Sequence, residues 1–218
     1  MEMTKNGLRY DVYPDQAVVL GFSKNTQLGG TLKIPHSVYC KPVTKIADEA
    51  FTGSSIEYVQ IPTTLKVIGC RAFSRCKSLK RFYISAKRYL PLSMKLTIVG
   101  EAFSFCEQLE EIETTQDLNI GSYAFYKCHN LKRISADIMS LSRHAIIGCK
   151  NLSSLMFSEN AMLAEESFLA SNINHVRFCT NADINPEVLG FMKSNEVQMV
   201  ADEESPLLEL AYEGYQIF

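Results

Sequence analysis

The sequence predicts a repeat protein of the α/β class: a right-handed solenoid with short parallel strands on its concave face, helical turns on the opposite side and a cap at each end. Three observations predict this fold. A short motif recurs about every 22 residues, an apolar segment of strand length follows each copy, and both ends of the chain depart from the pattern.

The motif is the dipeptide Ala-Phe with a cysteine three residues after the Phe, in three intact and three altered copies. The copies are Ala50-Phe51 with Ser54, Ala72-Phe73 with Cys76, Ala102-Phe103 with Cys106, Ala124-Phe125 with Cys128, Ala145-Ile146 with Cys149, and Ser167-Phe168 with Ser171. Their starts are 22, 30, 22, 21 and 22 residues apart. Periods of about 20–29 residues with this apolar pattern are typical of leucine-rich-repeat solenoids. The long interval predicts an insertion near residues 86–95.

The second observation is the apolar segment after each motif. These segments are Ile56–Ile61, Leu79–Ile84, Leu109–Thr114, Leu131–Ala136, Leu152–Phe157 and Ile173–Phe178. In each one we expect the first, fourth and sixth residues to point inward and the others outward, as strand alternation requires. Strands joined by crossovers must be parallel. The Ala-Phe stretch is interpreted as a helical turn with its Phe inside the solenoid.

The third observation concerns the ends, because a solenoid exposes its core there unless atypical units cover it. Residues 8–13 and 17–22 predict a hairpin, and the C-terminal part predicts a helix at 186–193, a strand at 196–201 and a last helix at 206–212. We therefore expect one structural domain. It would comprise an N-terminal hairpin cap at 1–27, leucine-rich repeats at 28–180 and a C-terminal cap at 181–218.

Composition and motifs exclude several classes of function. With 22 basic and 24 acidic side chains, the formal net charge is −2, which argues against a general nucleic-acid binder. There is no apolar run long enough for a transmembrane helix and no apolar leader at the N-terminus. The known catalytic and metal-binding motifs are missing, so we expect a non-enzymatic protein with no catalytic residues, metal or cofactor.

Cysteines are placed by the repeat itself. Cys76, Cys106, Cys128 and Cys149 share one motif position with Ser54 and Ser171, which favours buried structural thiols over a reactive or metal-binding ladder. The cysteines outside this position, and therefore better candidates for exposed thiols, are Cys40, Cys70 and Cys179.

The outward residues of the strands form the candidate binding face. Neighbouring parallel strands lie about 4.8 Å apart, so equivalent positions form ladders across the sheet. Two of these ladders alternate in sign, Lys80–Glu110–Lys132 and Arg81–Glu111–Arg133. One interpretation is mutual neutralisation within the sheet; the other is a face that matches a partner, and the two are compatible. The candidate partner-binding residues are Tyr58, Arg81, Tyr83, Glu111, Arg133, Met156, His175 and Arg177.

The full motif resembles one family in particular. The stretch Ile68-Gly69-Cys70-Arg71-Ala72-Phe73-Ser74-Arg75-Cys76-Lys77-Ser78-Leu79 is similar to the BspA-type (treponemal) leucine-rich repeats, and Ile-Pro dipeptides at 34–35 and 61–62 match the same family. The resemblance covers roughly residues 28–180. It implies a horseshoe-like solenoid, and a surface or secreted adhesion-type protein that binds host or matrix proteins.

The hypothesis is therefore a monomeric protein-binding module with a protein partner, whether host, matrix or bacterial. It would be extracellular or at the cell surface if a leader was removed, and cytoplasmic otherwise. One alternative is an intracellular scaffold or inhibitor that binds one bacterial partner. Another is a carbohydrate-binding surface protein, in which Tyr58 and Tyr83 would stack on sugars.

Overall fold

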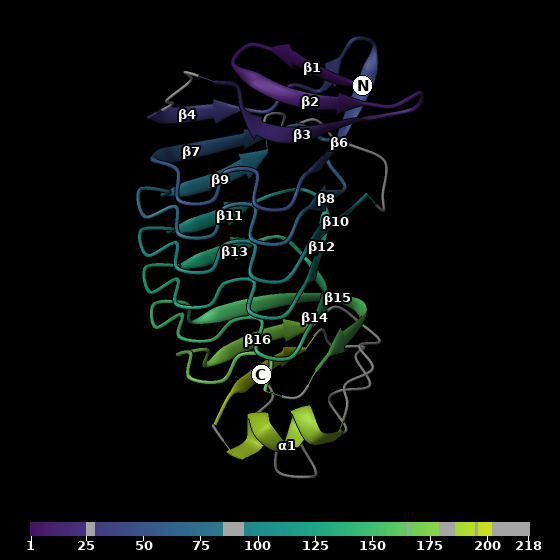
Figure 1. Ribbon diagram of the computed structural model, residues 1–218. Helices are drawn as coiled ribbons and strands as arrows, with labels where there is room; N and C mark the ends of the chain where they lie inside the picture. The colour runs from purple at the N-terminus through teal and green to yellow at the C-terminus, as the bar shows by residue number, and fades with distance from the viewer. Residues whose placement is uncertain (25–28, 85–93, 165, 179–185, 195, 202–218) are drawn as a thin grey trace.

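The computed structural model describes residues 1–24, 29–84, 94–164, 166–178, 186–194 and 196–201. The chain winds into an elongated stack of coils with the N-terminal strands at one end and α1 (Pro186–Ser194) with β17 (Gln198–Ala201) at the other (Figure 1). Most coils add one short strand to each of two parallel ladders, so the fold is a parallel-strand solenoid as the repeat predicted. The insertion predicted near residues 86–95 lies almost entirely outside the described residues. The helix predicted at 206–212 lies entirely outside them.

One ladder, here called the front sheet, holds the strands predicted from the apolar segments. Its parallel strands are β4 (Gly30–Lys33), β7 (Ile56–Ile61), β9 (Arg81–Ile84), β11 (Glu111–Glu113) and β13 (Arg133–Ser135). The stack continues through the first part of β15 (Ser154–Leu163), which pairs with β16 (His175–Phe178), and β16 pairs with β17 (Gln198–Ala201).

The second ladder, the back sheet, was not predicted. It consists of β3 (Ala17–Phe22), β6 (Lys41–Ile46), β8 (Val67–Ile68), β10 (Lys95–Ile98), β12 (Asp117–Ile120), β14 (Ile138–Leu141) and the end of β15. Each of these strands except β3 ends on the aliphatic residue that stands four positions before the motif alanine or its substitute. Strands of two to six residues are too short to show a reliable alternation, so their sequence resembles a connecting loop.

The inward register predicted for the front strands is confirmed. In all six segments the first, fourth and sixth residues are buried, and the four motif cysteines are fully buried beside them. Inside the solenoid the motif phenylalanines of the first four copies form a continuous stack. Successive ring centroids lie 5.3 Å apart from Phe51 to Phe73, 5.4 Å from Phe73 to Phe103 and 5.4 Å from Phe103 to Phe125. Each coil therefore buries its apolar stripe against its neighbours.

The helical turns predicted opposite the strands are wrong, and so is the α/β class for the described residues. The motif forms consecutive tight turns, in which the amide of Ala72 bonds the carbonyl of Gly69 (3.2 Å) and that of Ser74 bonds Arg71 (3.0 Å). The intervening amides point along the solenoid axis, so that the Phe73 amide donates to the Ala102 carbonyl of the next coil (2.8 Å). A helix would turn all of these amides back on its own coil.

This backbone needs a left-handed residue at two positions in every coil. The residue before the motif alanine, or before the Ser that replaces it, has φ between 53° and 60°; the members are Glu49, Arg71, Glu101, Tyr123, His144 and Glu166. The second position follows the motif Phe by two residues and is described below. Only two glycines occupy these positions, so the sequence carries little signal for the turns.

Glycine in the Ile-Gly part of the motif has a packing role. A Cβ on Gly69 would lie 2.6 Å from the backbone nitrogen of Asp48 and 2.7 Å from the carbonyl carbon of Ala47, both in the preceding coil. We therefore expect Gly69→Ala to lower the free energy of unfolding by about 1–3 kcal/mol, as other overpacking changes do. Urea unfolding measures the effect.

The matched control is Gly190→Ala in α1 (Pro186–Ser194), where a Cβ would meet nothing within 4 Å. Alanine is the better helix former by up to about 1 kcal/mol, so this change is expected to stabilise slightly. Equal effects of the two substitutions would contradict the close approach between the coils.

The N-terminal end is closed by antiparallel strands. β1 (Glu2–Lys5) pairs with β2 (Leu8–Val12), which pairs with β3, and β3 joins the back sheet in parallel with β6. The short strand β5 (Ser37–Val38) pairs with the start of β6. At the other end, α1 and β17 follow the last coil (Figure 1). The division into caps and repeats at residues 27 and 180 stays a prediction.

Candidate functional site

The outward face of the front sheet brings the predicted site residues into two rows. In the first row Tyr58 is paired with Arg81, Arg81 with Glu111 and Glu111 with Arg133 on neighbouring strands. In the second row Tyr83 pairs with Glu113 across β9 and β11. Farther along the stack, β15 and β16 place Met156 beside Arg177, and Ser154 beside His175. The eight predicted residues thus lie on one face, spread over six strands.

Glu111 is the centre of the charge pattern. Its carboxylate accepts from Arg81 Nε at 2.7 Å and from Arg133 at 2.5 Å, and only 13% of its side chain is exposed. Arg81 also reaches Glu113 at 2.6 Å. The ladder with alternating signs is therefore a connected ion-pair network. The arginine partners are exposed, and ion pairs with exposed partners contribute about 0.2–1 kcal/mol each, so their main effect is to hold the guanidinium groups in fixed positions.

The lysines and glutamates one position earlier in each segment also form ion pairs between neighbouring coils. Lys80 Nζ lies 2.7 Å from Glu57, and Lys132 Nζ lies 3.0 Å from Glu110. The mutual neutralisation considered for these strands is present in the structure. It uses partners on adjacent strands, as the parallel register requires.

Two tyrosines carry cations over their rings. Lys80 Nζ is 5.8 Å from the ring centre of Tyr58, and the Arg81 guanidinium is 5.7 Å from that of Tyr83. Such contacts stabilise by about 0.5–1 kcal/mol at exposed sites. They also cover part of each ring, which leaves less open aromatic surface for stacking on a sugar.

The face is hollowed at two adjoining places that share Arg133. The first hollow, the charged depression, has a volume of about 630 Å³ and is lined by Tyr58, Lys80, Arg81, Glu110, Glu111, Lys132 and Arg133. The second, the mixed depression, has a volume of about 500 Å³. Its lining includes Thr114, Asp117, Arg133, Asp137, Met156, His175 and Arg177. Of the predicted site residues, Tyr83 alone lines neither depression.

Two acidic residues of the mixed depression were missed by the sequence analysis. Asp117 is the first residue of β12 and Asp137 directly precedes β14, so both lie at the start of back-sheet strands that were not predicted. Partial burial, and then the nearby charge of Asp137, raise the pKa of the Asp117 carboxyl above its usual range. No signal in the sequence could have placed them in one depression with His175 and Arg177, because that grouping depends on where each coil turns.

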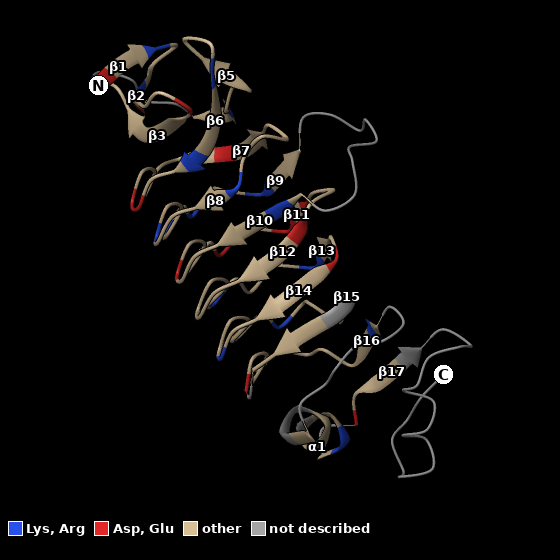
Figure 2. Ribbon diagram, turned by 90° about the vertical axis from the view of Figure 1, so that its right-hand side faces the viewer, with Lys and Arg blue, Asp and Glu red and all other residues tan. Residues whose placement is uncertain are grey.

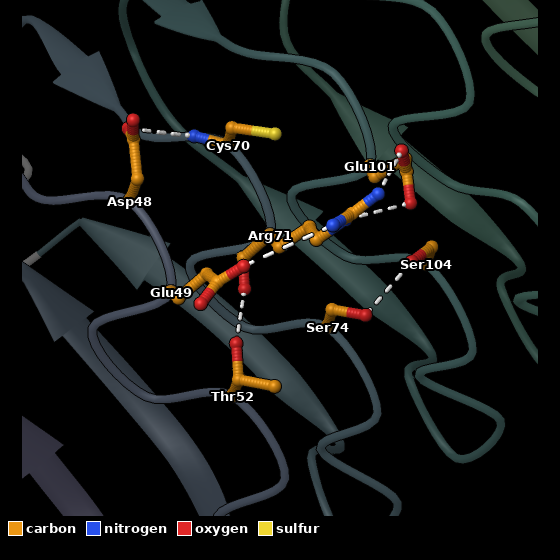
Figure 3. A network of polar contacts seen from close by, with 8 residues as sticks. All are labelled: Asp48, Glu49, Thr52, Cys70, Arg71, Ser74, Glu101 and Ser104. Carbon is orange, nitrogen blue, oxygen red and sulfur yellow. Dashed lines mark hydrogen bonds and ion pairs between the residues drawn. The ribbon is translucent and has the colours of Figure 1, made fainter.

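The opposite edge of the coils carries a second polar network, at the left-handed positions of the turns. Figure 3 shows the Arg71 guanidinium between two carboxylates, with Glu101 3.0 Å away on one side and Glu49 3.8 Å away on the other. The hydrogen bond from Arg71 lowers the pKa of Glu101. The tips of these turns form a row along one side of the solenoid, next to the arrowheads of the back-sheet strands (Figure 2).

Farther along this row the pattern changes to Tyr123, His144 and Glu166. The Tyr123 hydroxyl is 2.8 Å from His144 Nδ1, and His144 Nε2 is 2.8 Å from Glu166. The hydrogen bond from His144, and then that from Arg143, lower the pKa of Glu166. The two histidines of the turns, His129 and His144, make separate contacts, since His129 Nδ1 lies 2.9 Å from the Gly148 carbonyl.

The cysteines behave as their motif position predicts. The thiol of Cys106 donates to the carbonyl of Phe73 at 3.0 Å, and that of Cys149 donates to the carbonyl of Phe125 at 3.1 Å. Burial raises the pKa of the Cys149 thiol to about 12, which suppresses the reactive thiolate. Outside the motif, Cys40 is exposed and Cys70 is partly exposed, while Cys179 lies outside the described residues.

No group of three or more His, Cys, Asp or Glu side chains in the described part of the chain is arranged to hold a metal ion. Among the helices in that part, none combines the length and apolar character that crossing a membrane requires. The front face combines ion-paired charges, two aromatic rings and an exposed methionine around the two depressions.

Comparison with known structures agrees with the fold. A leucine-rich cell surface protein from Faecalibacterium prausnitzii is 22% identical with a TM-score of 0.64 over 94% of this chain, which spans 55% of that protein. The leucine-rich repeat protein of T. pallidum is 21% identical with a TM-score of 0.50, covering 81% of this chain and 71% of the other. A leucine-rich repeat protein from Eubacterium ventriosum is 18% identical with a TM-score of 0.53, over 79% of this chain and 50% of the other.

No curated protein sequence matches the chain significantly. The family of the BspA type leucine-rich repeat region matches this chain with six copies of its repeat. The matches fall in three overlapping stretches, residues 22–92, 44–172 and 88–196, which together cover most of the 218 residues. The repeated Ile-Gly-x-x-Ala-Phe-x-x-Cys motif, the two parallel ladders and this match lead to one conclusion: the chain belongs to the BspA-type leucine-rich repeat family.

Proposed function

We propose that the protein is a non-enzymatic protein-binding module of the surface adhesion type, and that it recognises a protein partner through the outward face of the front sheet. The observation that carries the proposal is the coincidence of the two depressions with seven of the eight candidate residues. The name of the Faecalibacterium structure, a cell surface protein, supports the location.

The physical character of the face supports a protein partner. Arginine and tyrosine are the residue types that most often anchor protein interfaces, and here both are held by neighbours before any partner arrives. Arg81 is fixed by Glu111, Glu113 and the ring of Tyr83, so binding costs it little side-chain entropy. Met156, 37% exposed, adds an adaptable apolar contact in the mixed depression.

Strand β15 offers a matched pair of variants to test this proposal. Met156 lies on the front face, whereas Met162 on the same strand pairs with β14 in the back sheet and is 70% exposed. We expect Met156→Glu to weaken binding about tenfold, as loss of an interface anchor does, and Met162→Glu to leave binding unchanged. Surface plasmon resonance against purified extracellular-matrix proteins, with the wild-type chain as reference, measures both.

Binding that both variants retain would move the site off the front face. Capture of one cytosolic protein in place of any matrix protein would favour the intracellular scaffold. Exchange of Arg81 and Glu111 is a less clean test, because the new arginine would face Arg133 and the new glutamate would face Glu113. The exchange would therefore alter stability as well as recognition.

A further inference from the structure

The turns carry a second exposed surface that the front-face proposal does not use. It is built on the left-handed position two residues after the motif Phe or its substitute, where φ lies between 55° and 77°. The residues at this position are Gly53, Arg75, Phe105, Lys127, Gly148 and Ala170. The position accepts glycine in two coils, yet three consecutive coils place a long or aromatic side chain there. A side chain with a Cβ costs about 1–2 kcal/mol in this conformation.

Phe105 links these three side chains across the coils, because both cations lie against its ring. The Arg75 guanidinium lies 5.5 Å from the ring centre of Phe105, and Lys127 Nζ lies 5.4 Å from the same ring. Lys127 Nζ is also 5.2 Å from the ring centre of Tyr126, which meets the ring of Phe105 edge-on at 5.2 Å. Two cations are therefore held against a pair of partly exposed rings.

The apolar surface continues into the following coils. At the position directly after the motif Phe or its substitute, the early coils carry Ser74 and Ser104, which are buried and bonded to each other at 2.9 Å. The later coils carry Tyr126, Ile147 and Leu169 instead, and Leu169 is 40% exposed. Tyr123, also 40% exposed, contacts Tyr126 at 5.9 Å. We call Phe105, Tyr123, Tyr126, Ile147 and Leu169 the turn patch.

The charges around the turn patch are unbalanced. In the described part of the chain, the turn carboxylates pair with other cations: Glu101 with Arg71, Glu107 with Lys77 and Glu166 with Arg143. No described carboxylate lies within ion-pair distance of Arg75 or Lys127. Their positive charges therefore have no counter-charge among the described carboxylates, and they lie beside an exposed apolar surface.

From this arrangement we infer that the turn patch binds an acidic segment of a partner protein, one in which carboxylates alternate with leucine or aromatic side chains. The carboxylates would pair with Arg75 and Lys127, whose positions the rings already restrict, and the apolar side chains would cover Tyr126, Ile147 and Leu169. A glycan fits less well, because sugars stack on open ring faces. Here the faces of Phe105 and Tyr126 are approached by cations, and the two rings stand at 87° to each other.

The test uses a short fluorescein-labelled peptide in which Glu alternates with Leu or Phe, and the same peptide with Gln in place of Glu. Fluorescence anisotropy with the full chain is expected to show tighter binding of the Glu peptide, and added salt should weaken it. Phe105→Gly should reduce the affinity about tenfold. Lys127→Gly and Arg75→Gly should each reduce it about two- to fivefold, as expected for partly exposed ion pairs.

Glycine variants are chosen because the position already holds glycine in two coils, so the turn should fold in each of them. Lys150→Gln, an exposed lysine on a neighbouring turn, is the control and should bind as wild type does. Circular dichroism establishes that all variants are folded. A Phe105→Gly chain that is folded but no longer binds the Glu peptide supports the turn patch.

Three results would overturn the inference. Equal affinity for the Glu and Gln peptides, or no binding of the Glu peptide, would remove the acidic partner. Binding of heparin in place of the peptide would mean that the surface recognises an anionic glycan. Self-association that sedimentation detects in the wild type and that Phe105→Gly abolishes, without peptide binding, would mean that a second copy of this chain covers the patch.

Discussion

Replacing Phe103 with alanine is expected to lower the free energy of unfolding by about 3–5 kcal/mol, the range for truncating a buried aromatic side chain. The side chain of Phe103 is fully buried. Its ring centre lies 5.4 Å from those of Phe73 and Phe125 and 5.1 Å from that of Phe82, which meets it edge-on. The substitution therefore leaves a cavity in the middle of the stack that joins the coils.

The consequence should extend beyond one coil, because each coil of a solenoid is stabilised by its immediate neighbours. Guanidinium unfolding followed by circular dichroism measures the loss, and amide exchange locates it on both sides of residue 103. The control is Phe103→Ile, since Ile146 occupies the equivalent position in a later coil. Phe103→Ile should keep most of the stability that Phe103→Ala loses. A loss below about 1 kcal/mol for the alanine variant would be typical of a surface site and would contradict the burial of the stack.

Raising the pH above about 9 is expected to destabilise the fold steeply, through three of the four buried motif thiols. The fourth, Cys76, differs because its hydrogen bond with Cys106 lowers its pKa. Burial raises the pKa of the Cys149 thiol from 9.0 to about 12, and burial likewise raises the pKa of Cys106 and Cys128 well above 9.0. Between these values the unfolded chain releases protons that the folded chain still holds. Stability is therefore fully present below pH 9 and falls as the pH rises, by about 1.4 kcal/mol per pH unit for each thiol.

Chemical unfolding at a series of pH values from 8 to 10 measures this slope. The upper limit of pH 10 avoids most of the contribution of Tyr10, whose pKa burial raises from 10.0 to about 12. Cys149→Ser keeps a donor for the Phe125 carbonyl but removes the titration, so it should reduce the slope by about one thiol's share. Cys40→Ser, at an exposed cysteine, should leave the slope unchanged. An unaltered slope in the Cys149 variant would show that these thiols do not limit alkaline stability.

The sequence predicts the front sheet well because its signal is redundant. Six copies repeat the same inward positions, so errors in one copy are corrected by the others, and burial confirms all of them. The back sheet was missed because β8 has two residues and β10, β12 and β14 have four each, too few to display a period. The helical turns were predicted wrongly because the spacing of small and aromatic residues in the motif suits two structures. It fits a helical turn, and it fits equally a pair of tight turns with left-handed residues.

The candidate site also has one part that the sequence predicts and another that only the structure shows. Equivalent positions on parallel strands must be neighbours, so the pairing of Arg81, Glu111 and Arg133 could be predicted from their motif positions. Arg81 also pairs with a second carboxylate, that of Glu113. This contact depends on side-chain conformation and is visible only in the structure. The mixed depression likewise joins Asp117 and Asp137 to residues of β15 and β16 through the path of the loops.

By itself, the sequence determined the repeat, the residues that face inward, the burial of the motif cysteines and the family, because each follows from the identity and spacing of residues along the chain. Only the tertiary structure decided that the turns are not helical, that a second sheet closes the coils, and that Arg75, Phe105 and Lys127 meet on one exposed surface. These features depend on hydrogen bonds and contacts between coils. Such contacts join residues 19 to 31 positions apart and leave little trace in the local sequence of either partner.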